Sequence, residues 1–144
     1  SVSIEIRRKS VAAPPRQMRL WHQDLIPRLP RAQLLGQHRE CCALRGNGWG
    51  RPHATVDYVF AHPRAALVAY HLAVIAEMER RGYRPDPRWK NPAHRGSAAP
   101  PDSPPPVPPA GRAYPEHTRA YLRECRALLR RRGAVLEKAV TERL

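Results

Sequence analysis

The chain has few acidic residues, few cysteines and few aromatic residues for its 144 positions. Its three cysteines are Cys41, Cys42 and Cys125. Adjacent cysteines cannot easily bridge each other, so no disulfide framework is expected and a reduced protein is favoured. No apolar run is long enough to span a bilayer, and the first residues lack the apolar segment of a signal peptide. We therefore expect a cytoplasmic protein with no membrane partner.

Common signatures of enzymes and metal sites are also missing. The sequence contains no P-loop, no GxSxG, no HExxH and no paired Cys/His pattern for zinc. Its 7 histidines are scattered singly, and His38 and His71 fall on apolar stripes, which is typical of core histidines. The Cys41–Cys42 pair has no visible activating partner and is interpreted as structural. We expect no metal and no organic cofactor.

Positive charge is what the chain has in excess. It carries 26 Lys and Arg against 12 Asp and Glu, a formal net charge of +14, and its arginines extend from Arg7 to Arg143. Such a surface attracts polyanions, of which DNA and RNA are the commonest. A basic surface that only serves solubility, or a coding bias toward arginine, are the alternatives. The composition favours a nucleic-acid partner.

The apolar residues cluster at helical spacing, which predicts a compact all-α domain of three helices with long loops and a Pro-rich connector. One domain's core is all that this length supports, and VDYVF (residues 56–60) is expected to be an irregular or helical connector because a single strand has no partner. The helices are predicted at Pro30–Leu44, Pro63–Arg81 and Pro115–Arg132. The expected segments are a disordered extension (1–17), a helical core (18–96), a Pro-rich linker (97–113) and a C-terminal helical segment of the same domain (114–144).

Glu40 is the only acidic residue of the first predicted helix. At 100° per residue it lies on a polar side with Gln33 and Gln37, opposite the apolar side of the helix. A carboxylate repels phosphate. The helix is nevertheless followed by a Gly-rich loop that is well suited to contact phosphate, since Arg45 and Arg51 flank it and His53 follows. Glu40 therefore either forms a salt bridge with a nearby arginine or has a chemical role. Both alternatives stay open on this pattern alone.

Several segments resemble a known family: MRLW, LPRAQLLGQHRECCALRGNGWG, HATVDYVF, YHLAVIAEMERRGY and the pair Arg95–Gly96. They are similar to the pyrimidine-dimer DNA glycosylase/AP lyase family, the phage-type endonuclease V, and especially to its bacterial members. The resemblance covers about residues 18–96 and is weaker in YPEHTRAYLREC. It implies an all-α enzyme that acts on pyrimidine dimers in damaged double-stranded DNA through an α-amine Schiff base, without a cofactor. We expect a monomer.

The resemblance also implies roles for single residues. Met18 aligns with the family's amino-terminal nucleophile, so the functional protein is expected to begin there, and Glu40 matches its essential glutamate. Gln33 stands where the phage enzyme has a histidine, and that enzyme's aromatic C-terminal tail has no counterpart here. The residues expected to bind DNA are Arg19, Gln33, Arg39, Arg45, Arg51 and His53. The alternative is a basic helical DNA-binding protein without catalysis.

Overall fold

The computed structural model describes residues 19–46 and 56–138, and within these ranges it is helical with no strand. Its three α-helices confirm the predicted all-α class and fall close to the predicted ranges. VDYVF forms part of a 3-10 helix, as the lack of a partner strand suggested. In chain order the elements are η1 (Gln23–Arg28), α2 (Arg31–Arg45), η2 (Asp57–Ala61), α3 (Arg64–Arg80), η3 (Pro87–Lys90) and α4 (Arg119–Arg131).

Helix boundaries follow from local chemistry. Pro30 and Pro63 are the N-caps of α2 and α3, where the missing N–H of proline costs nothing. Helix α4 begins at Arg119, four residues later than predicted from Pro115, because Thr118 caps it: the Thr118 side chain accepts the N–H of Tyr121 at 3.1 Å. After α3, Gly82 turns the chain at a φ of +92°, a value that suits glycine.

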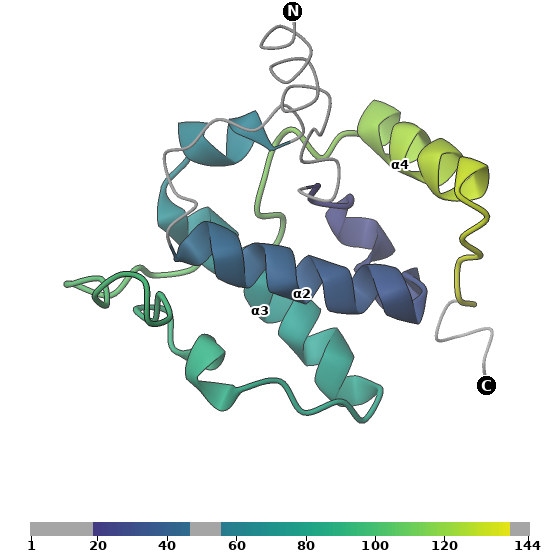
Figure 1. Cartoon of the computed structure of the whole chain (residues 1–144). Helices are drawn as coiled ribbons and strands as arrows, with labels where there is room; N and C mark the ends of the chain where they lie inside the picture. The colour runs from purple at the N-terminus through teal and green to yellow at the C-terminus, as the bar shows by residue number, and fades with distance from the viewer. Residues whose placement is uncertain (1–18, 47–55, 139–144) are drawn as a thin grey trace, which may run out of the picture.

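Helices α2 and α3 pack against each other and form the centre of the molecule (Figure 1). Helix α3 is covered on several sides, which explains why its buried residues are spread around the helix instead of forming one stripe. The apolar spacing of the second predicted helix places five residues on one stripe, and the structure confirms it because all five are buried in α3: Leu67, His71, Val74, Ile75 and Met78.

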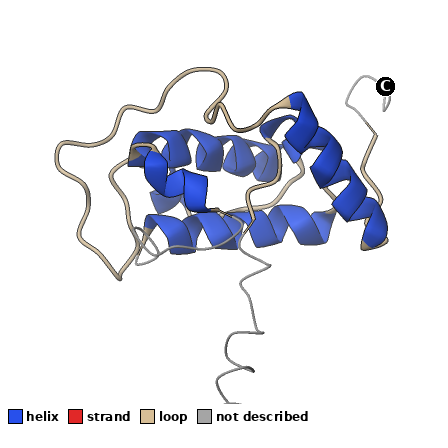
Figure 2. Ribbon diagram, turned by 90° about the horizontal axis from the view of Figure 1, so that it is seen from above, coloured by secondary structure: helices blue, strands red, loops and turns tan. Residues whose placement is uncertain are grey.

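A long connector without helix or strand runs from Asn91 to Thr118 and leads to α4, which lies at an angle near one end of the α2–α3 pair (Figures 1 and 2). Ala113, Tyr114 and His117 bury the end of this connector in the core. In α4 itself Cys125 and Leu129 are buried, whereas Tyr121 and Leu122 are only partly covered. The Pro-rich connector therefore allows α4 to pack against the same core as α2 and α3.

The α4 helix also meets the N-terminal segment directly. The Tyr121 hydroxyl donates to the carbonyl oxygen of Leu20 at 2.6 Å, and farther along the chain Arg28 donates to the carbonyl of Glu137 at 2.8 Å. Both contacts join residues that are more than 100 positions apart in the sequence. Within the described ranges, no helix combines the length and apolarity that crossing a membrane requires.

Two buried histidines lie where the connector meets η1. The N–H of Gln23 donates to Nδ1 of His117 at 3.0 Å, and Nε2 of His117 lies 2.6 Å from the Tyr58 hydroxyl. His22 caps η1 by accepting the N–H of Asp24, and its Nε2 lies 2.9 Å from the carbonyl of His117. Burial, with the nearby His22 and Arg112, lowers the pKa of His117 to about 3.

Acid is expected to destabilise the fold through these histidines. Below about pH 6.5, the ordinary pKa of histidine, His117 takes up a proton in the unfolded chain but not in the folded protein. At pH 5 this difference lowers the free energy of unfolding by about 2 kcal/mol. Burial lowers the pKa of His71 too, which adds a loss of the same sign. Glu40, whose pKa is raised to about 8, opposes them between pH 4.5 and 8, so the loss is expected to be plain once this carboxyl is removed. Urea unfolding of Glu40→Gln should show a lower stability at pH 5 than at pH 7.5; equal stability of this variant at both values would contradict this.

Candidate active site

Glu40 lies on α2 beside the N-terminal segment, which enters the structure at Arg19. The backbone N–H of Arg19 donates to Oε2 of Glu40 at 2.6 Å, a charge-assisted distance. The side chain of Glu40 is partly buried. Among the described residues no Lys or Arg side chain forms an ion pair with it. The salt-bridge interpretation of Glu40 therefore finds no support in the described part of the chain.

Burial raises the pKa of Glu40 to about 8, against the opposing effects of the Arg19 N–H and of Arg132, Arg39 and the Arg19 side chain. Desolvation dominates because the ionised form loses more hydration than these donors and cations return. A carboxyl that titrates near neutral pH can both take up and release a proton under physiological conditions. Strong pKa perturbation of this kind is frequent at functional sites.

Gln37, one turn before Glu40, fixes the N-terminal segment. Its Oε1 accepts the N–H of Trp21 at 2.7 Å, and its Nε2 donates to the carbonyl of Arg19 at 2.7 Å and to Oε2 of Glu40 at 3.4 Å. The side chain is 1% exposed. The predicted polar side of the helix is thus wrong for Gln37, because the segment 19–21 covers it and satisfies its amide with backbone groups.

Tyr70 on α3 completes this arrangement. Its hydroxyl lies 2.6 Å from the Trp21 carbonyl and 2.8 Å from Oε1 of Gln37, and its one hydrogen can donate to either acceptor. Gln37 and Tyr70 together, here called the Gln37–Tyr70 clamp, hold the backbone of residues 19–21 next to Glu40. Sequence patterns gave no sign of Tyr70, which lies among the apolar residues of α3.

Tyr70→Phe is expected to cost about 2 kcal/mol, because it leaves a buried carbonyl with one donor fewer while keeping the ring. We further expect the segment 19–21 to loosen more than the rest of the fold. Hydrogen exchange of the Arg19 and Trp21 amides would show this, compared with amides in the middle of α3. Tyr83→Phe is the matched control, since its ring is only partly buried at the edge of the core. Equal protection of the Trp21 amide in Tyr70→Phe and wild type would contradict the clamp.

Cations surround this site. Arg39 is exposed on α2, and Arg132, at the end of α4, lies with its guanidinium 5.6 Å from the Trp21 ring centroid. Arg19 lies over the same ring at 5.7 Å. The Arg19 Nε–H is buried and has no acceptor among the described residues. Arg132 was missed by sequence reasoning because nothing local links the end of α4 to Glu40.

The other predicted site residues are distributed unevenly. Gln33 is partly exposed on α2, two turns before Glu40 and on the same side of the helix. Met18, Arg51 and His53 lie outside the described residues.

Arg45 does not fit the phosphate contact expected for it. It is 1% exposed, and its guanidinium donates to the carbonyls of Trp89, Asn91 and His94 at 2.8–2.9 Å and contacts His71. The positive charge thus anchors the loop around η3. Arg95 in turn donates to the carbonyls of Arg45 and Gly46 at the end of α2. A side chain at Gly96 would meet the Trp89 ring at 3.2 Å, so the resembling pair Arg95–Gly96 has a structural basis.

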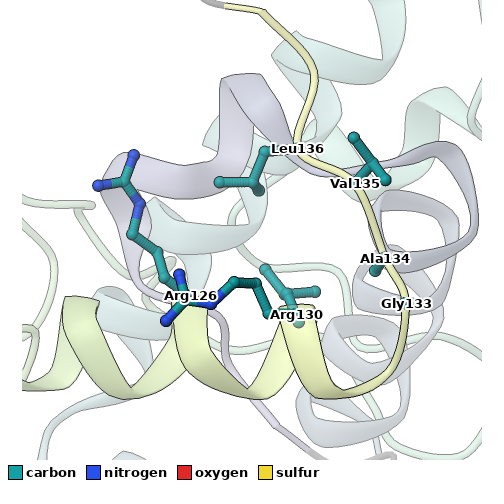
Figure 3. Close-up of a pocket in the computed structure, with 7 residues that line it drawn as sticks. Arg126, Arg130, Gly133, Ala134, Val135 and Leu136 are labelled. Carbon is teal, nitrogen blue, oxygen red and sulfur yellow. The ribbon is translucent and has the colours of Figure 1, made fainter.

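A second surface feature lies along α4. Arg126 and Arg130 line an open groove together with residues 133–136 (Figure 3), and Leu129 also lines it. Glu40 is not among the residues that line it. The groove extends the positive surface beyond Arg132 and is suited to contact a polyanion.

Comparison with known proteins bears on what this arrangement does. A family model described as pyrimidine dimer DNA glycosylase matches residues 18–91, 74 of the 144 positions and so slightly more than half of the chain. No curated protein and no solved structure matches. The matched range contains Glu40, the Gln37–Tyr70 clamp and both central helices. The chain belongs to the pyrimidine dimer DNA glycosylase family.

Proposed function

We propose that the protein is a bifunctional DNA glycosylase/AP lyase that acts on pyrimidine dimers in duplex DNA through the α-amine of Met18. The observation that carries this proposal is the contact of Glu40 with the backbone N–H of Arg19, the residue that follows Met18. A partly buried carboxyl and the segment that follows Met18 thereby meet at one point. The family implies damaged DNA as the substrate.

The chemistry suits these groups. An α-amine has a pKa of about 7.7–8.0, so a substantial fraction is neutral and nucleophilic near pH 7.5. The amine attacks C1′ of the damaged nucleotide's sugar: the N–C1′ bond forms, the glycosidic bond breaks and the base leaves with the electron pair and a proton. Loss of the ring oxygen from C1′, as a hydroxyl at C4′, gives the iminium of a Schiff base. Removal of a C2′ proton then expels the 3′ phosphate by β-elimination.

Glu40 serves this sequence in two ways. In its protonated form it gives a proton to the ring oxygen as the sugar opens, and as a carboxylate it stabilises the iminium cation and takes up a proton. A carboxyl pKa of about 8 allows both forms at physiological pH. The positive charge of the intermediate explains why a negative group is useful within a basic surface that binds an anion.

DNA binding falls to the cations and polar groups around Glu40. We assign Arg19, Arg39 and Gln33 to contacts at the lesion, and Arg51 and His53 to the adjoining DNA. The exposed arginines of α4 then hold phosphates in a salt-dependent manner. Extrusion of a nucleotide costs a few kcal/mol and less at a lesion that stacks poorly, which helps to select damage.

The test is an assay of a chain that begins at Met18 on two duplexes, one with a single cyclobutane dimer and one with an abasic site, with and without borohydride. The proposal expects strand cleavage without borohydride and a covalent protein–DNA adduct with it. Binding to both duplexes without cleavage or adduct would favour the second candidate, a DNA-binding protein without catalysis, which the +14 net charge supports equally well. Cleavage of the abasic duplex alone would keep the lyase and remove the dimer glycosylase.

A further inference from the structure

Two histidines and a cysteine meet between α2 and α3. His38 and Cys42 lie one turn apart on α2, and His71 lies on α3. The distance from Nδ1 of His38 to Nε2 of His71 is 2.9 Å, and Sγ of Cys42 lies 4.0 Å from Nδ1 of His38 and 3.9 Å from Nε2 of His71. The three possible ligand atoms all lie within 4.8 Å of one another. At 100° per residue, His38 and Cys42 point away from the Glu40 side of α2.

These distances are close to those of a tetrahedral transition-metal site. Zinc binds imidazole nitrogen at about 2.0–2.1 Å and thiolate sulfur at about 2.3 Å, which places the ligand nitrogens about 3.4 Å apart and sulfur about 3.6 Å from each nitrogen. The two ring nitrogens must separate by about half an ångström, and the sulfur must approach each of them by about 0.3–0.4 Å. Side-chain rotations of this size need no movement of the helices.

We propose that His38, Cys42 and His71 bind one zinc-class divalent cation and so cross-link α2 to α3, with water as the fourth ligand. Two imidazoles and one thiolate are the ligand types that zinc and similar borderline metals prefer. His38 and Cys42 are partly exposed, so an ion can enter from solvent, whereas His71 is buried. Cys41, the next residue, is fully buried in the core and takes no part.

Protons must move when the ion binds. Nη1 of Arg45 lies 2.9 Å from Nδ1 of His71, so in the metal-free protein Nδ1 of His71 accepts and Nε2–H donates to His38. On binding, the His71 proton shifts from Nε2 to Nδ1, and Arg45 keeps its three carbonyl acceptors. The Cys42 thiol loses its proton to solvent. One proton is therefore released for each ion bound.

Charges around the cluster limit and tune its affinity. Arg45 and Arg39 disfavour a cation, since both lower the pKa of His38. The Cys42 thiolate offsets one charge of the ion, and Asp86 acts in the same direction because it raises the pKa values of both His38 and Cys42.

The site has a structural role in this proposal and is separate from the proposed DNA chemistry. Joining α2 to α3 opposite the Glu40 side would stiffen the two helices that carry Glu40, Gln37 and Tyr70. A ligand that binds only the folded state raises its stability by mass action. The ion is thus expected to raise the melting temperature while leaving the reacting groups untouched.

The experiment uses the reduced, full-length, untagged chain after chelator treatment, titrated with Co²⁺ as an optical probe for a tetrahedral site. We expect one Co²⁺ to bind per chain and to give a thiolate-to-cobalt charge-transfer band. Zn²⁺ should then displace the Co²⁺ and abolish this band. Cys42→Ser should lose the band and at least 100-fold in affinity, whereas Cys41→Ala, the matched control, should keep both. His38→Gln should weaken binding if Cys42→Ser fails to fold.

A wild-type protein without the charge-transfer band, or an equal band in Cys42→Ser, would overturn the site. DNA cleavage is measured separately on a chain that begins at Met18 and is loaded with Co²⁺ in the same way, because residues 1–17 block the amine that the proposed function requires. Cobalt binding in a protein that does not cleave DNA would support the metal site and remove the proposed enzyme function. DNA cleavage without any cobalt band would support the proposed enzyme function and remove the metal site.

Discussion

Glu40→Gln is expected to bind dimer-containing duplex DNA as wild type does but to cleave it about 10²–10³-fold more slowly, the usual cost of removing one preorganised charge-stabilising group. The amide keeps the shape of the carboxyl and can still accept the Arg19 N–H, so the site should stay assembled. It can neither carry the negative charge that the iminium needs nor transfer a proton. Single-turnover cleavage of an abasic duplex, with binding measured by titration, separates the two effects.

The same variant should be more stable than wild type, by an amount that grows from pH 4.5 to pH 8 and is constant above pH 8. Burial raises the pKa of Glu40 to about 8, so above pH 4.5 the wild-type protein must fold either by protonating Glu40 or by burying it in its ionised form, and a neutral amide avoids both costs. Glu124→Gln on the exposed face of α4 is the matched control and should change neither cleavage nor stability. Wild-type cleavage by Glu40→Gln, or a marked loss of stability, would return Glu40 to a structural role.

A chain that begins at Met18 is expected to form the borohydride-trapped adduct at its N-terminus, and a chain with residues 1–17 attached is expected to form none there. In the longer chain the nitrogen of Met18 is an amide and cannot form a Schiff base. Positioning a nucleophile beside its target contributes about 7–11 kcal/mol, which an amine seventeen residues away from Met18 lacks. Mass spectrometry of the trapped peptide identifies the residue that carries the sugar.

One extra residue in front of Met18 makes a sharp control. It keeps a free amine but moves it by about 3.5 Å along the chain. The rate of trapping should fall steeply while DNA affinity stays the same, because the amine no longer lies where the Glu40 carboxyl can serve it. Trapping at Ser1 or at an internal lysine of the longer chain, at the rate of the Met18 chain, would refute this assignment.

Sequence patterns predicted the helices well, because each one has local signals of its own. Pro30 and Pro63 marked the starts of α2 and α3, and apolar spacing gave the stripe of α3 that the structure confirms. The start of α4 was less accurate, since the Thr118 cap competes with Pro115 as a starting signal.

The surroundings of Glu40 could not be predicted in this way. Gln37 looks like a surface residue until the segment 19–21 covers it, and Arg45 looks like a phosphate ligand until the carbonyls of residues 89–94 surround it. The guanidinium of Arg132 lies over the Trp21 ring, although more than a hundred positions separate the two residues in the sequence. Such partners depend on how the helices pack, which helical periodicity alone does not contain.

The link between Tyr121 and Leu20 has a consequence for synthesis on the ribosome. The segment that carries Leu20 leaves the ribosome about 100 residues before the helix that supplies the Tyr121 hydroxyl. Until then Leu20 and Trp21, both buried in the finished protein, lack their α4 partners. Long-range contacts of this kind slow folding and leave apolar surface open to aggregation in partly made chains. The nascent protein therefore cannot complete its Glu40 site before α4 has been made.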